Sequence, residues 1–426
     1  MIVQKAFKFR LYPDSDQQKA LSIQFGHSRF VYNRYLDMRK TLFLDVGLSF
    51  NYYACANDLA LLKQSEEFAW LQEADSQVLQ QALTDLDKAF QNFFRNHREG
   101  ALPKVGKKPR KDGMPKGYPN FHRKHDEQSI RYPQRVTLKE NAVYLPKVGT
   151  VKAHFHCALV GKINSATVSK TKSGKYFVSL QCAMETPEPQ DRSNDPAIGL
   201  DLGLKDFATL STGEKMAPPK PLKGMKRRLA IRQRRVSRKL EAKKDNGLWV
   251  NRDKGDKSIK KAAKVVATTH EKIANRRKDF HHQLSRRLVN RFGLIALEAL
   301  NVKGMMQNGN LALSIADAGW SQLVNFLTYK QAWVGGEIIH VDRFYPSSKT
   351  CSACGAKHAS LKLSDRRWIC PGCGTIHDRD ENAAVNILKQ ATVGTTESST
   401  ANCTNAVGHM SQPVGNSAPE SIKTFE

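Results

Sequence analysis

The stretch FYPSSKTCSACG, residues 344–355, together with CPGCGTIHDRDENAAVNIL, residues 370–388, decides how the remaining chain is interpreted. It holds two CxxC pairs at the spacing that lets two tight turns close a tetrahedral zinc site. The four cysteines are Cys351, Cys354, Cys370 and Cys373. Asp378 and Asp380 follow directly, and the alanine-rich run after them is typical of a helix. We therefore expect one structural Zn²⁺ that positions a carboxylate at the start of this helix.

The overall charge predicts a nucleic-acid partner. The chain has 68 Lys and Arg residues against 40 Asp and Glu residues, which gives a formal net charge of +28. A compact protein with this excess repels itself unless an anionic polymer such as DNA or RNA neutralises it. A membrane partner is disfavoured, because no apolar run approaches the length that spans a bilayer. The amino terminus shows no secretory signal, so we expect a cytoplasmic protein.

The amino-terminal half predicts a small β-barrel that a helical lobe interrupts. Residues 1–14 and 122–190 contain short alternating apolar runs separated by turn signals, which is typical of strands with one buried face. Residues 15–121 carry apolar side chains at three- and four-residue spacing, which indicates three or four packed helices. The sequence therefore predicts a barrel domain and a helical recognition lobe that ends in a basic loop.

Two features of the helical lobe favour contact with nucleic acid. Ser76 and Gln80 lie on the polar face of a predicted helix, where hydroxyl and amide groups can read base edges. A solvated helix face explains these two residues equally well. Between Lys104 and Lys124 the chain then has eight basic residues against one acid, a loop that should follow a phosphate backbone. The candidate contacts in this loop are Lys104, Lys107, Lys108 and Arg110.

A second basic region lies in the carboxyl-terminal half. Between Pro221 and Arg291 there are 24 Lys and Arg residues against 6 Asp and Glu residues. Apolar residues such as Leu229 and Leu284 recur near helical spacing, so we expect amphipathic helices. A solvated face usually mixes both signs of charge, and a face of one sign therefore favours a nucleic-acid track over an idle surface. The candidate contacts are Arg227, Arg228, Arg234, Arg235, Arg276 and Arg277.

Three carboxylates are each embedded in an apolar element. Asp201 lies in IGLDLG, Glu298 in IALEAL, and Asp380 precedes AAVNIL. A single acid at a strand end is commonly a cap or an ion-pair partner. Three such acids are costly to bring together unless cations neutralise them. We therefore expect two Mg²⁺ ions that hydrolyse a phosphodiester, one by activating the attacking water and one by stabilising the leaving oxygen.

Several separate motifs occur in the order found in one known family. FRLYP and GHSRFVYN stand near the amino terminus, GLDLGLKDFATLSTG and LIALEAL follow, and HDRDENAAVNI comes after the cysteine quartet. From about Lys5 to Leu388, the chain resembles the TnpB (OrfB) proteins of small bacterial insertion sequences. These proteins are RNA-guided DNA nucleases related to the type V CRISPR effectors.

The resemblance implies an α+β multidomain fold. A wedge-like barrel and the helical lobe precede a RuvC/RNase H-like nuclease domain formed by residues 196–348 and 375–392. A four-cysteine zinc ribbon, residues 349–374, is inserted into that domain. Residues 393–426 are rich in Ser, Thr, Asn and Gly, so we expect a disordered tail.

The resemblance also implies an activity, its residues and its partners. Asp201, Glu298 and Asp380 would be the catalytic, Mg²⁺-binding triad, and Asp378 a supporting or capping acid. The partners would be a guide RNA from the element end and a double-stranded target DNA, cut next to a short motif. Tyr52 and Gln80 fall where contacts to that motif would lie. The basic residues of the zinc insertion, Lys349, Lys357, Lys362 and Arg366, would touch phosphate unless the insertion is a purely structural clip.

Two other functions fit the same residues. An RNase H-like transposase would use the three acids for strand transfer on element DNA. A non-cleaving nucleic-acid-binding regulator would carry the acids without using them. Because all three acids are present, the sequence favours an active endodeoxyribonuclease.

Overall fold

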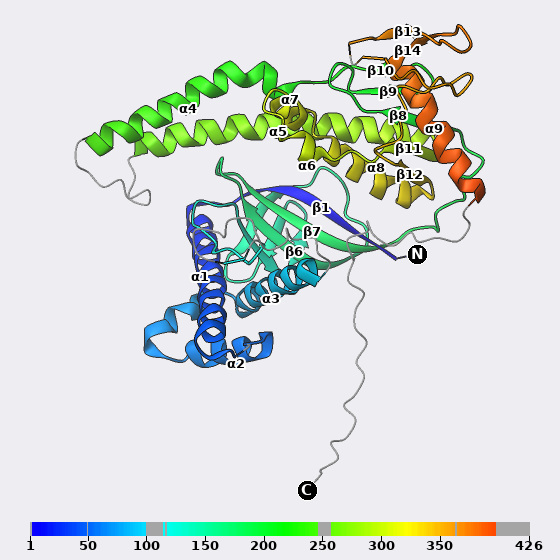
Figure 1. The fold of residues 1–426 in the computed structure, drawn as a ribbon. Helices are drawn as coiled ribbons and strands as arrows, with labels where there is room; N and C mark the ends of the chain where they lie inside the picture. The colour runs from blue at the N-terminus through cyan, green and yellow to red at the C-terminus, as the bar shows by residue number, and fades with distance from the viewer. Residues whose placement is uncertain are drawn as a thin grey trace. The chain divides into compact units, whose positions relative to one another are not determined.

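The computed structural model describes residues 2–48, 50–98, 114–115, 117–245, 257–362 and 364–397. The chain forms two compact units, each assembled from two separate segments (Figure 1). The first unit comprises Met1–Pro189 and Pro221–Lys278, and the second comprises Gln190–Lys220 and Asp279–Glu426. Each unit has a hydrophobic core of its own, as expected of separate domains.

An antiparallel sheet of seven strands, in the order β2-β6-β7-β1-β5-β4-β3, is the centre of the first unit. The strands are β1 (Ile2–Tyr12), β2 (Gln128–Tyr132), β3 (Thr137–Lys139), β4 (Ala142–Leu145), β5 (Gly149–His154), β6 (Lys162–Lys170) and β7 (Tyr176–Glu185). β1 lies in the middle of the order, between β7 and β5. Its alternation buries Phe9 and Leu11 completely, and the sheet curls around these side chains into a half-barrel (Figure 1).

A helical lobe is inserted between β1 and β2. In the described part of the chain it contains α1 (Ser15–Val46), α2 (Tyr52–Leu62), the 3₁₀-helix η1 (Glu66–Glu73) and α3 (Ser76–Arg98). α1 begins with a capping box, in which the Asp14 carboxylate accepts hydrogen bonds from the N–H groups of Asp16 and Gln17. It ends at Gly47, whose φ of 72° lies in the left-handed region that favours glycine. The lobe has its own core, which includes Leu83 of α3.

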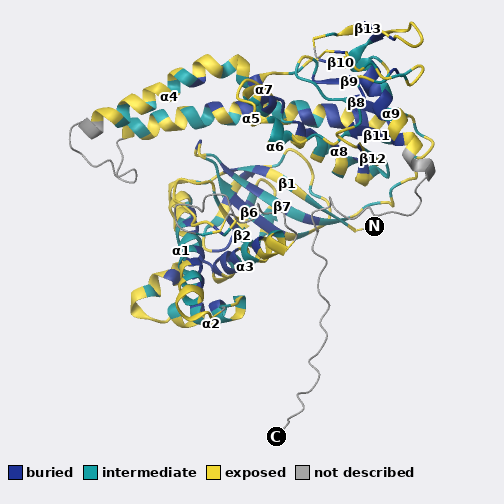
Figure 2. Cartoon of the chain, in the orientation of Figure 1, coloured by how far each residue is buried: buried dark blue, intermediate teal, exposed yellow. Residues whose placement is uncertain are grey.

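Two long helices follow the sheet in the first unit. α4 (Pro221–Asp245) and α5 (Lys257–Arg291) lie side by side and run in opposite directions (Figure 1). Hydrogen bonds join Arg232 to Thr269 and Lys239 to Ser258. Figure 2 shows that much of α4 is exposed to solvent. α5 belongs to the first unit up to Lys278 and to the second unit beyond it.

The second unit contains a mixed sheet of five strands in the order β10-β9-β8-β11-β12. The strands are β8 (Ala197–Asp201), β9 (Ala208–Leu210), β10 (Lys215–Met216), β11 (Leu294–Glu298) and β12 (Glu337–Val341). β8, β11 and β12 run parallel, while β9 and β10 are antiparallel to their neighbours. The carboxyl ends of the three parallel strands therefore meet at one edge, which is where open α/β sheets bind ligands.

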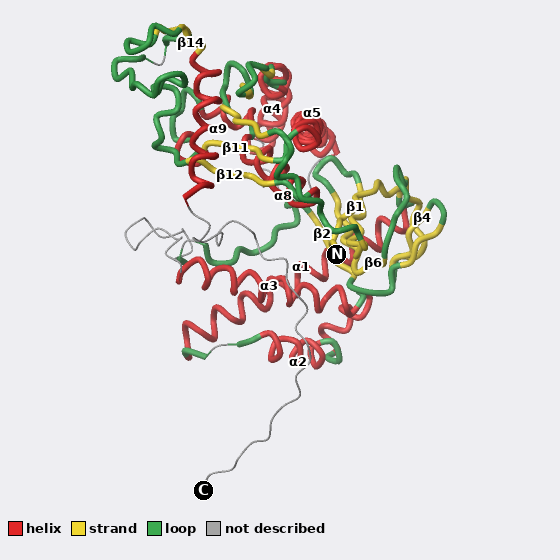
Figure 3. The backbone as a smooth tube through the Cα atoms, turned by 90° about the vertical axis from the view of Figure 1, so that its right-hand side faces the viewer, coloured by secondary structure: helices red, strands yellow, loops and turns green. Residues whose placement is uncertain are grey.

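Helices pack against both faces of this sheet. They are the end of α5, α6 (Val302–Met305), α7 (Ala312–Ala318), α8 (Trp320–Val334) and α9 (Arg379–Glu397). Leu200 and Leu297 point into the core formed with α5, α7 and α8. The other face packs against α9, which lies beside β11 and β12 in Figure 3. At Gly199 the contact is so close that a Cβ would stand 2.1 Å from the carbonyl oxygen of Ala384 in α9.

The predicted architecture is confirmed in outline, since a half-barrel and a helical lobe are joined to an α/β unit with a four-cysteine loop. This loop lies between β12 and α9 and contains the hairpin β13 (Arg367–Ile369) and β14 (Ile376–Asp378). The predicted tail from residue 393 begins inside α9, which extends to Glu397, and residues 398–426 lie outside the described residues. None of the described helices is both long enough and apolar enough to cross a membrane.

We expect Phe9→Ala to lower the free energy of unfolding by about 3–5 kcal/mol, because it removes a buried ring and leaves a cavity in the half-barrel core. Tyr12→Ala, at the exposed end of the same strand, should cost about 1 kcal/mol or less. Urea unfolding monitored by circular dichroism measures both values. Equal losses in the two variants would contradict the assigned core.

Candidate active site and metal centre

Two of the three predicted acids stand at the ends of neighbouring parallel strands. β8 pairs with β11 so that Leu200 lies opposite Leu297, and Asp201 and Glu298 follow one step further along. Side chains alternate along a strand, and both leucines point into the core on the far side of the sheet. Asp201 and Glu298 therefore share the face against which α9 packs.

The third acid, Asp380, comes from the first turn of α9. Asp378 precedes it, and its Oδ1 accepts hydrogen bonds from the N–H groups of Asp380 (3.1 Å) and Glu381 (3.3 Å). These bonds cap the helix, as predicted for Asp378. Lys215 of β10 donates from Nζ to Asp378 Oδ2 at 2.6 Å. Although burial opposes the shift, this contact and the amide hydrogen bonds lower the pKa of Asp378.

Asp201 lies in the electrostatic field of the other two acids. Burial, and then the negative charges of Asp380 and Glu298, raise the pKa of Asp201 to about 7. Burial also raises the pKa of Glu298. Carboxyl groups that resist ionisation in this way are a site that a divalent cation would stabilise. The structure thus places Asp201 and Glu298 at one edge of the sheet, and Asp380 near enough to raise the pKa of Asp201.

Asp380 is paired with a cation from the cysteine loop. The Arg366 Nη1 atom lies 3.1 and 3.2 Å from the two carboxylate oxygens of Asp380. The carbonyl of Arg366 also accepts a hydrogen bond from the N–H of Arg379 at 2.8 Å. The sequence analysis predicted a phosphate contact for Arg366, whereas the structure pairs Arg366 with Asp380, a predicted catalytic acid. A cation bound by the three acids would have to compete with this guanidinium.

The four cysteines have the geometry of a metal centre. In the part of the chain that the structure describes, they form the one group of three or more potential ligands whose ligand atoms all lie within 4.8 Å of one another. The Sγ atoms of Cys351 and Cys373 are 3.7 Å apart, and those of Cys354 and Cys370 are 3.6 Å apart. Tetrahedral zinc with Zn–S bonds of about 2.3 Å needs sulfur atoms about 3.8 Å apart. The cluster can therefore hold a metal such as zinc.

A buried histidine of β14 lies against this centre. His377 Nε2 lies 3.0 Å from Cys351 Sγ, and the ring packs on Trp368 with 4.7 Å between ring centroids. An N–H that donates to a metal-binding sulfur is a common outer partner of such sites. The sequence shows that His377 precedes Asp378, but the cysteine spacing does not show which cysteine His377 contacts.

Two asparagines fasten the cysteine loop to the helix of Asp380. Asn386 Nδ2 donates to the carbonyl oxygens of Ser347 (2.8 Å) and Thr350 (2.6 Å). Asn382 Nδ2 donates to Thr350 at 2.7 Å, and its Oδ1 accepts from the N–H of Ser352 at 2.8 Å. Both side chains are almost completely buried. The i, i+4 spacing of the two residues shows that they share a helix face, but not what that face binds.

Of the predicted nucleic-acid contacts, three arginines gather around one groove of about 500 Å³. Arg227 and Arg228 of α4 and Arg276 of α5 line it. Arg234 and Arg235 are exposed further along α4. Arg277 is only half-exposed and does not line this groove. These arginines remain predicted contacts.

The other predicted contacts lie on or near the helical lobe. Ser76 begins α3 and accepts a hydrogen bond from Lys63 Nζ at 3.0 Å, and Gln80 is exposed one turn later. Tyr52 begins α2 and packs edge-on against Tyr53. These three residues are separate from the arginine groove. The loop residues Lys104, Lys107, Lys108 and Arg110 lie outside the described residues.

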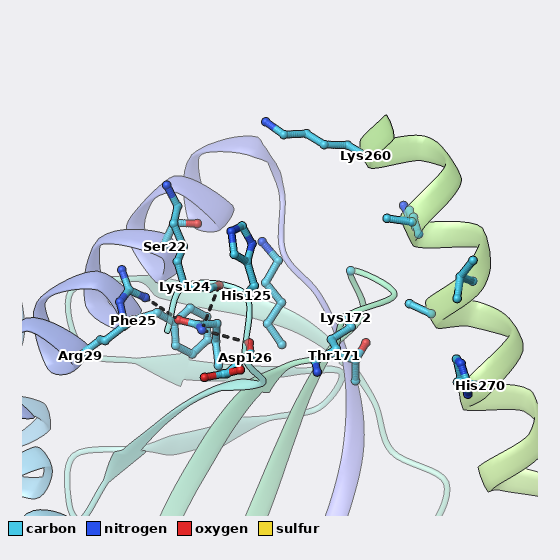
Figure 4. A pocket seen from close by; sticks show the side chains of 17 residues that line it. Ser22, Phe25, Arg29, Lys124, His125, Asp126, Thr171, Lys172, Lys260 and His270 are labelled. Atoms are coloured by element: carbon cyan, nitrogen blue, oxygen red, sulfur yellow. Dashed lines mark hydrogen bonds between the residues drawn. The ribbon is translucent and has the colours of Figure 1, made fainter. Parts of the chain in front are cut away.

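The sequence did not single out a larger basic cleft in the first unit. Its volume is about 700 Å³, and α1, the loop before β2, the β6–β7 turn and α5 line it (Figure 4). Asp126 is the one acid among its lining residues. The basic residues that line it are Arg29, Lys124, His125, Lys170, Lys172, Lys260, Lys264 and His270. They come from four separate elements, so no local run of charge marks the cleft.

Models of three known families match the chain. "Cas12f1-like, TNB domain" covers residues 320–387, "Probable transposase" covers residues 179–309, and "Helix-turn-helix domain" covers residues 1–43. Residues 2–43 of this stretch fold as β1 and most of α1, and therefore as a strand and a single long helix.

Two curated relatives are similar over nearly their whole length. A protein of Streptomyces pristinaespiralis named RNA-guided DNA endonuclease is 38% identical over 91% of this chain and 89% of its own. The protein InsQ of Escherichia coli (strain K12), with the same designation, is 30% identical over 90% of this chain and 91% of its own. The solved structure of the mini-RNA-guided endonuclease CRISPR-Cas_phi3 shares the fold at a TM-score of 0.50 and 11% identity. That match covers 92% of this chain and 93% of the other.

Without divalent cations, we expect Asp201→Asn to raise the Tm at pH 8 and to raise it much less at pH 5. The pKa of Asp201 in the folded protein, about 7, is above the value near 4 of an unfolded chain. Stability from this group is therefore present at low pH and is lost as the pH rises through 7. Thermal unfolding in EDTA across this range measures the effect, with the exposed Glu67→Gln as control. A Tm difference independent of pH would contradict the burial of a charged Asp201.

Cys370→Ser should remove the metal and lower the Tm in the same sample, because a structural zinc centre contributes directly to folding. Cys157→Ser changes an exposed cysteine outside the cluster and should alter neither value. Elemental analysis of the purified proteins and calorimetry provide the two readings. Full metal content in Cys370→Ser would show that the cluster does not bind it.

Proposed function

The chain belongs to the TnpB (OrfB) family of insertion-sequence proteins, and on this basis we propose that it is an RNA-guided DNA endonuclease encoded by a transposable element. It cleaves target DNA next to a short motif by metal-dependent phosphodiester hydrolysis. The observation that supports the proposal is that Asp201 and Glu298 end neighbouring parallel strands, and that burial and the charges of Asp380 and Glu298 raise the pKa of Asp201 to about 7.

The chain's own residues prepare a site for two Mg²⁺ ions. Asp201, Glu298 and Asp380 would hold the ions, because carboxylate oxygens are the ligands that Mg²⁺ prefers. Ions held there would supply the activation of the attacking water and the stabilisation of the leaving oxygen of the cleaved strand. Asp378 and Lys215 hold the first turn of α9 so that Asp380 stays on the shared face. Arg366 keeps Asp380 neutralised before metal binding and, once released, is placed to attract the phosphate of the substrate.

The cysteine cluster would hold one Zn²⁺ with a structural role. The thiolates close the loop between β12 and α9, and Asn382 and Asn386 bind that loop to the helix of Asp380. A metal at the cluster would therefore stabilise the position of Asp380 without taking part in hydrolysis.

The nucleic-acid partners follow from the family and from the charge. The basic cleft in Figure 4 and the arginine groove of α4 and α5 offer two tracks for phosphate backbones. We assign these tracks to the guide RNA and the target DNA together, since relatives over the same length are named RNA-guided DNA endonucleases.

A transposase is the second candidate, because one matching family model is described as "Probable transposase". It would use the same acids for strand transfer. Supplying the protein with element-end DNA, with and without the RNA that copurifies with it, separates the two activities. Joining of DNA ends without RNA would favour the transposase.

We expect Asp201→Ala to lower RNA-programmed cleavage about a thousandfold or more, because it removes a ligand of ions that contribute several kcal/mol to the transition state. Binding of the copurifying RNA should not change. Sequencing this RNA identifies the guide, a programmed plasmid measures cleavage, and a gel-shift assay measures RNA binding. Asp206→Ala, in the turn after β8, is the matched control. Cleavage at the rate of the unmodified protein would overturn the assignment of the triad.

A further inference from the structure

A pocket of about 490 Å³ opens at the carboxyl ends of β11 and β12 in the second unit. Glu298 forms part of its wall, so the pocket adjoins the predicted catalytic acids. The remaining walls come from the segments after β8 and β11, from the first turns of α8, and from the end of β12 and the residues after it. A group in this pocket would therefore lie beside Glu298, one of the predicted metal-binding acids.

The walls of the pocket are mixed in character. Leu202, Leu300 and Val324 supply apolar surface, and Ser321 and Asn325 supply exposed polar groups from α8. Apolar walls with a few polar groups are typical of sites for organic ligands, not for bare ions. The lining therefore fits a flat group that has apolar faces and polar edges.

One wall carries a hydrogen-bond donor without a partner. Trp320 lines the pocket and is 2% exposed, and its buried Nε1–H has no acceptor among the described residues. An unpaired buried donor is costly, and an acceptor on a ligand would remove that cost. Burial lowers the pKa of His340, another lining residue, so its ring is neutral at pH 7 and offers an uncharged hydrogen-bonding group.

The mouth of the pocket suits a nucleic-acid strand. Arg343 lines the pocket, and its guanidinium lies over the ring of Phe344 at 4.7 Å from the centroid. Phe344 is 78% exposed, an unusual position for a large aromatic side chain. Exposed aromatic rings beside a cation are the usual platform for an unpaired base and its phosphate.

We propose that this pocket holds one unstacked base of the DNA strand whose phosphodiester lies at Asp201, Glu298 and Asp380. The inference deepens the proposed nuclease function and rests on it. The base enters the pocket and meets Trp320 and Asn325, while its phosphate stays at the mouth near Arg343.

Charge explains why the base and not the phosphate is inside. Glu298 and Arg343 are the acid and the base among the lining residues, so the pocket has no net positive charge. A phosphate inside would lose its hydration against the apolar walls, with Arg343 as the one Lys or Arg side chain among the lining residues to compensate it. A base carries no charge and fits the apolar walls. Because a base can enter only after it leaves its stack, the pocket selects an unpaired strand over a duplex.

The test scans the target for the base that occupies the pocket. In RNA-programmed DNA, each nucleotide around the cleavage position is replaced in turn by an abasic residue. We expect cleavage by the wild-type protein to slow about fivefold or more at one position relative to the cut, because a base stacked on aromatic groups is lost there. Equal rates at all positions would overturn the proposal.

A variant that fills the pocket tests the location. Ser321→Phe adds a ring at the wall, and it should slow cleavage of every substrate equally and abolish the dependence on the abasic position. Thr328→Phe, on an exposed site two turns along α8 and outside the pocket, should keep that dependence. A dependence that survives in Ser321→Phe would overturn the assignment to this pocket.

A binding assay separates this inference from the proposed function. The probe is a single-stranded DNA pentamer with one central 2-aminopurine, added to Asp201→Ala protein. We expect its fluorescence to be quenched near Trp320, and the quenching to be lost with Ser321→Phe but not with Thr328→Phe. Quenching without any RNA-programmed cleavage by the wild-type protein would overturn the nuclease function and leave the base pocket standing. Cleavage without quenching would overturn the pocket alone.

Discussion

The burial of Asp201 beside the charges of Asp380 and Glu298 is the constraint on which the predicted site of the second unit depends. Burial alone disfavours the ionised form of such groups, and each neighbour makes it less favourable. Strand register fixes the positions of Asp201 and Glu298, whereas the position of Asp380 depends on how α9 packs. The side-chain amides of Asn382 and Asn386 hydrogen-bond α9 to the cysteine loop. The position of Asp380 therefore depends on the folding of the cysteine loop.

The sequence predicted the acids because each interrupts an apolar run, and an interruption of that kind is visible without a structure. Strand order was not visible, so the sharing of one face by Asp201 and Glu298 had to come from the pairing of Leu200 with Leu297. The cysteine quartet was equally plain, since its spacing is local. Asn382, Asn386 and His377 were not predicted as contacts, because their partners lie on a segment that only folding brings near.

The basic surface also has a part that the sequence predicted and a part that it did not. A run of charge within one helix, such as Arg227 with Arg228, is read directly from the sequence, and the structure adds Arg276 from a neighbouring helix to the same groove. The cleft of Figure 4 was missed because four separate elements each contribute one or two cations. The pocket beside Glu298 was missed for a related reason, since its apolar walls look like core residues until the hollow between them is known. Net charge thus predicts a class of partner, and packing determines where that partner fits.

The close approach of Gly199 to α9 has a consequence for how activity is inherited. Any side chain at this position would meet the carbonyl of Ala384, and the helix would have to move away from the sheet. Such a change keeps all three acids in the sequence but moves Asp380, on α9, away from Asp201 and Glu298 in the folded protein. A related protein can therefore lose its activity while it keeps all three acids, and the presence of the three acids in a sequence does not by itself establish an active protein. A comparison of active and inactive relatives should therefore examine the residue at Gly199 together with the three acids.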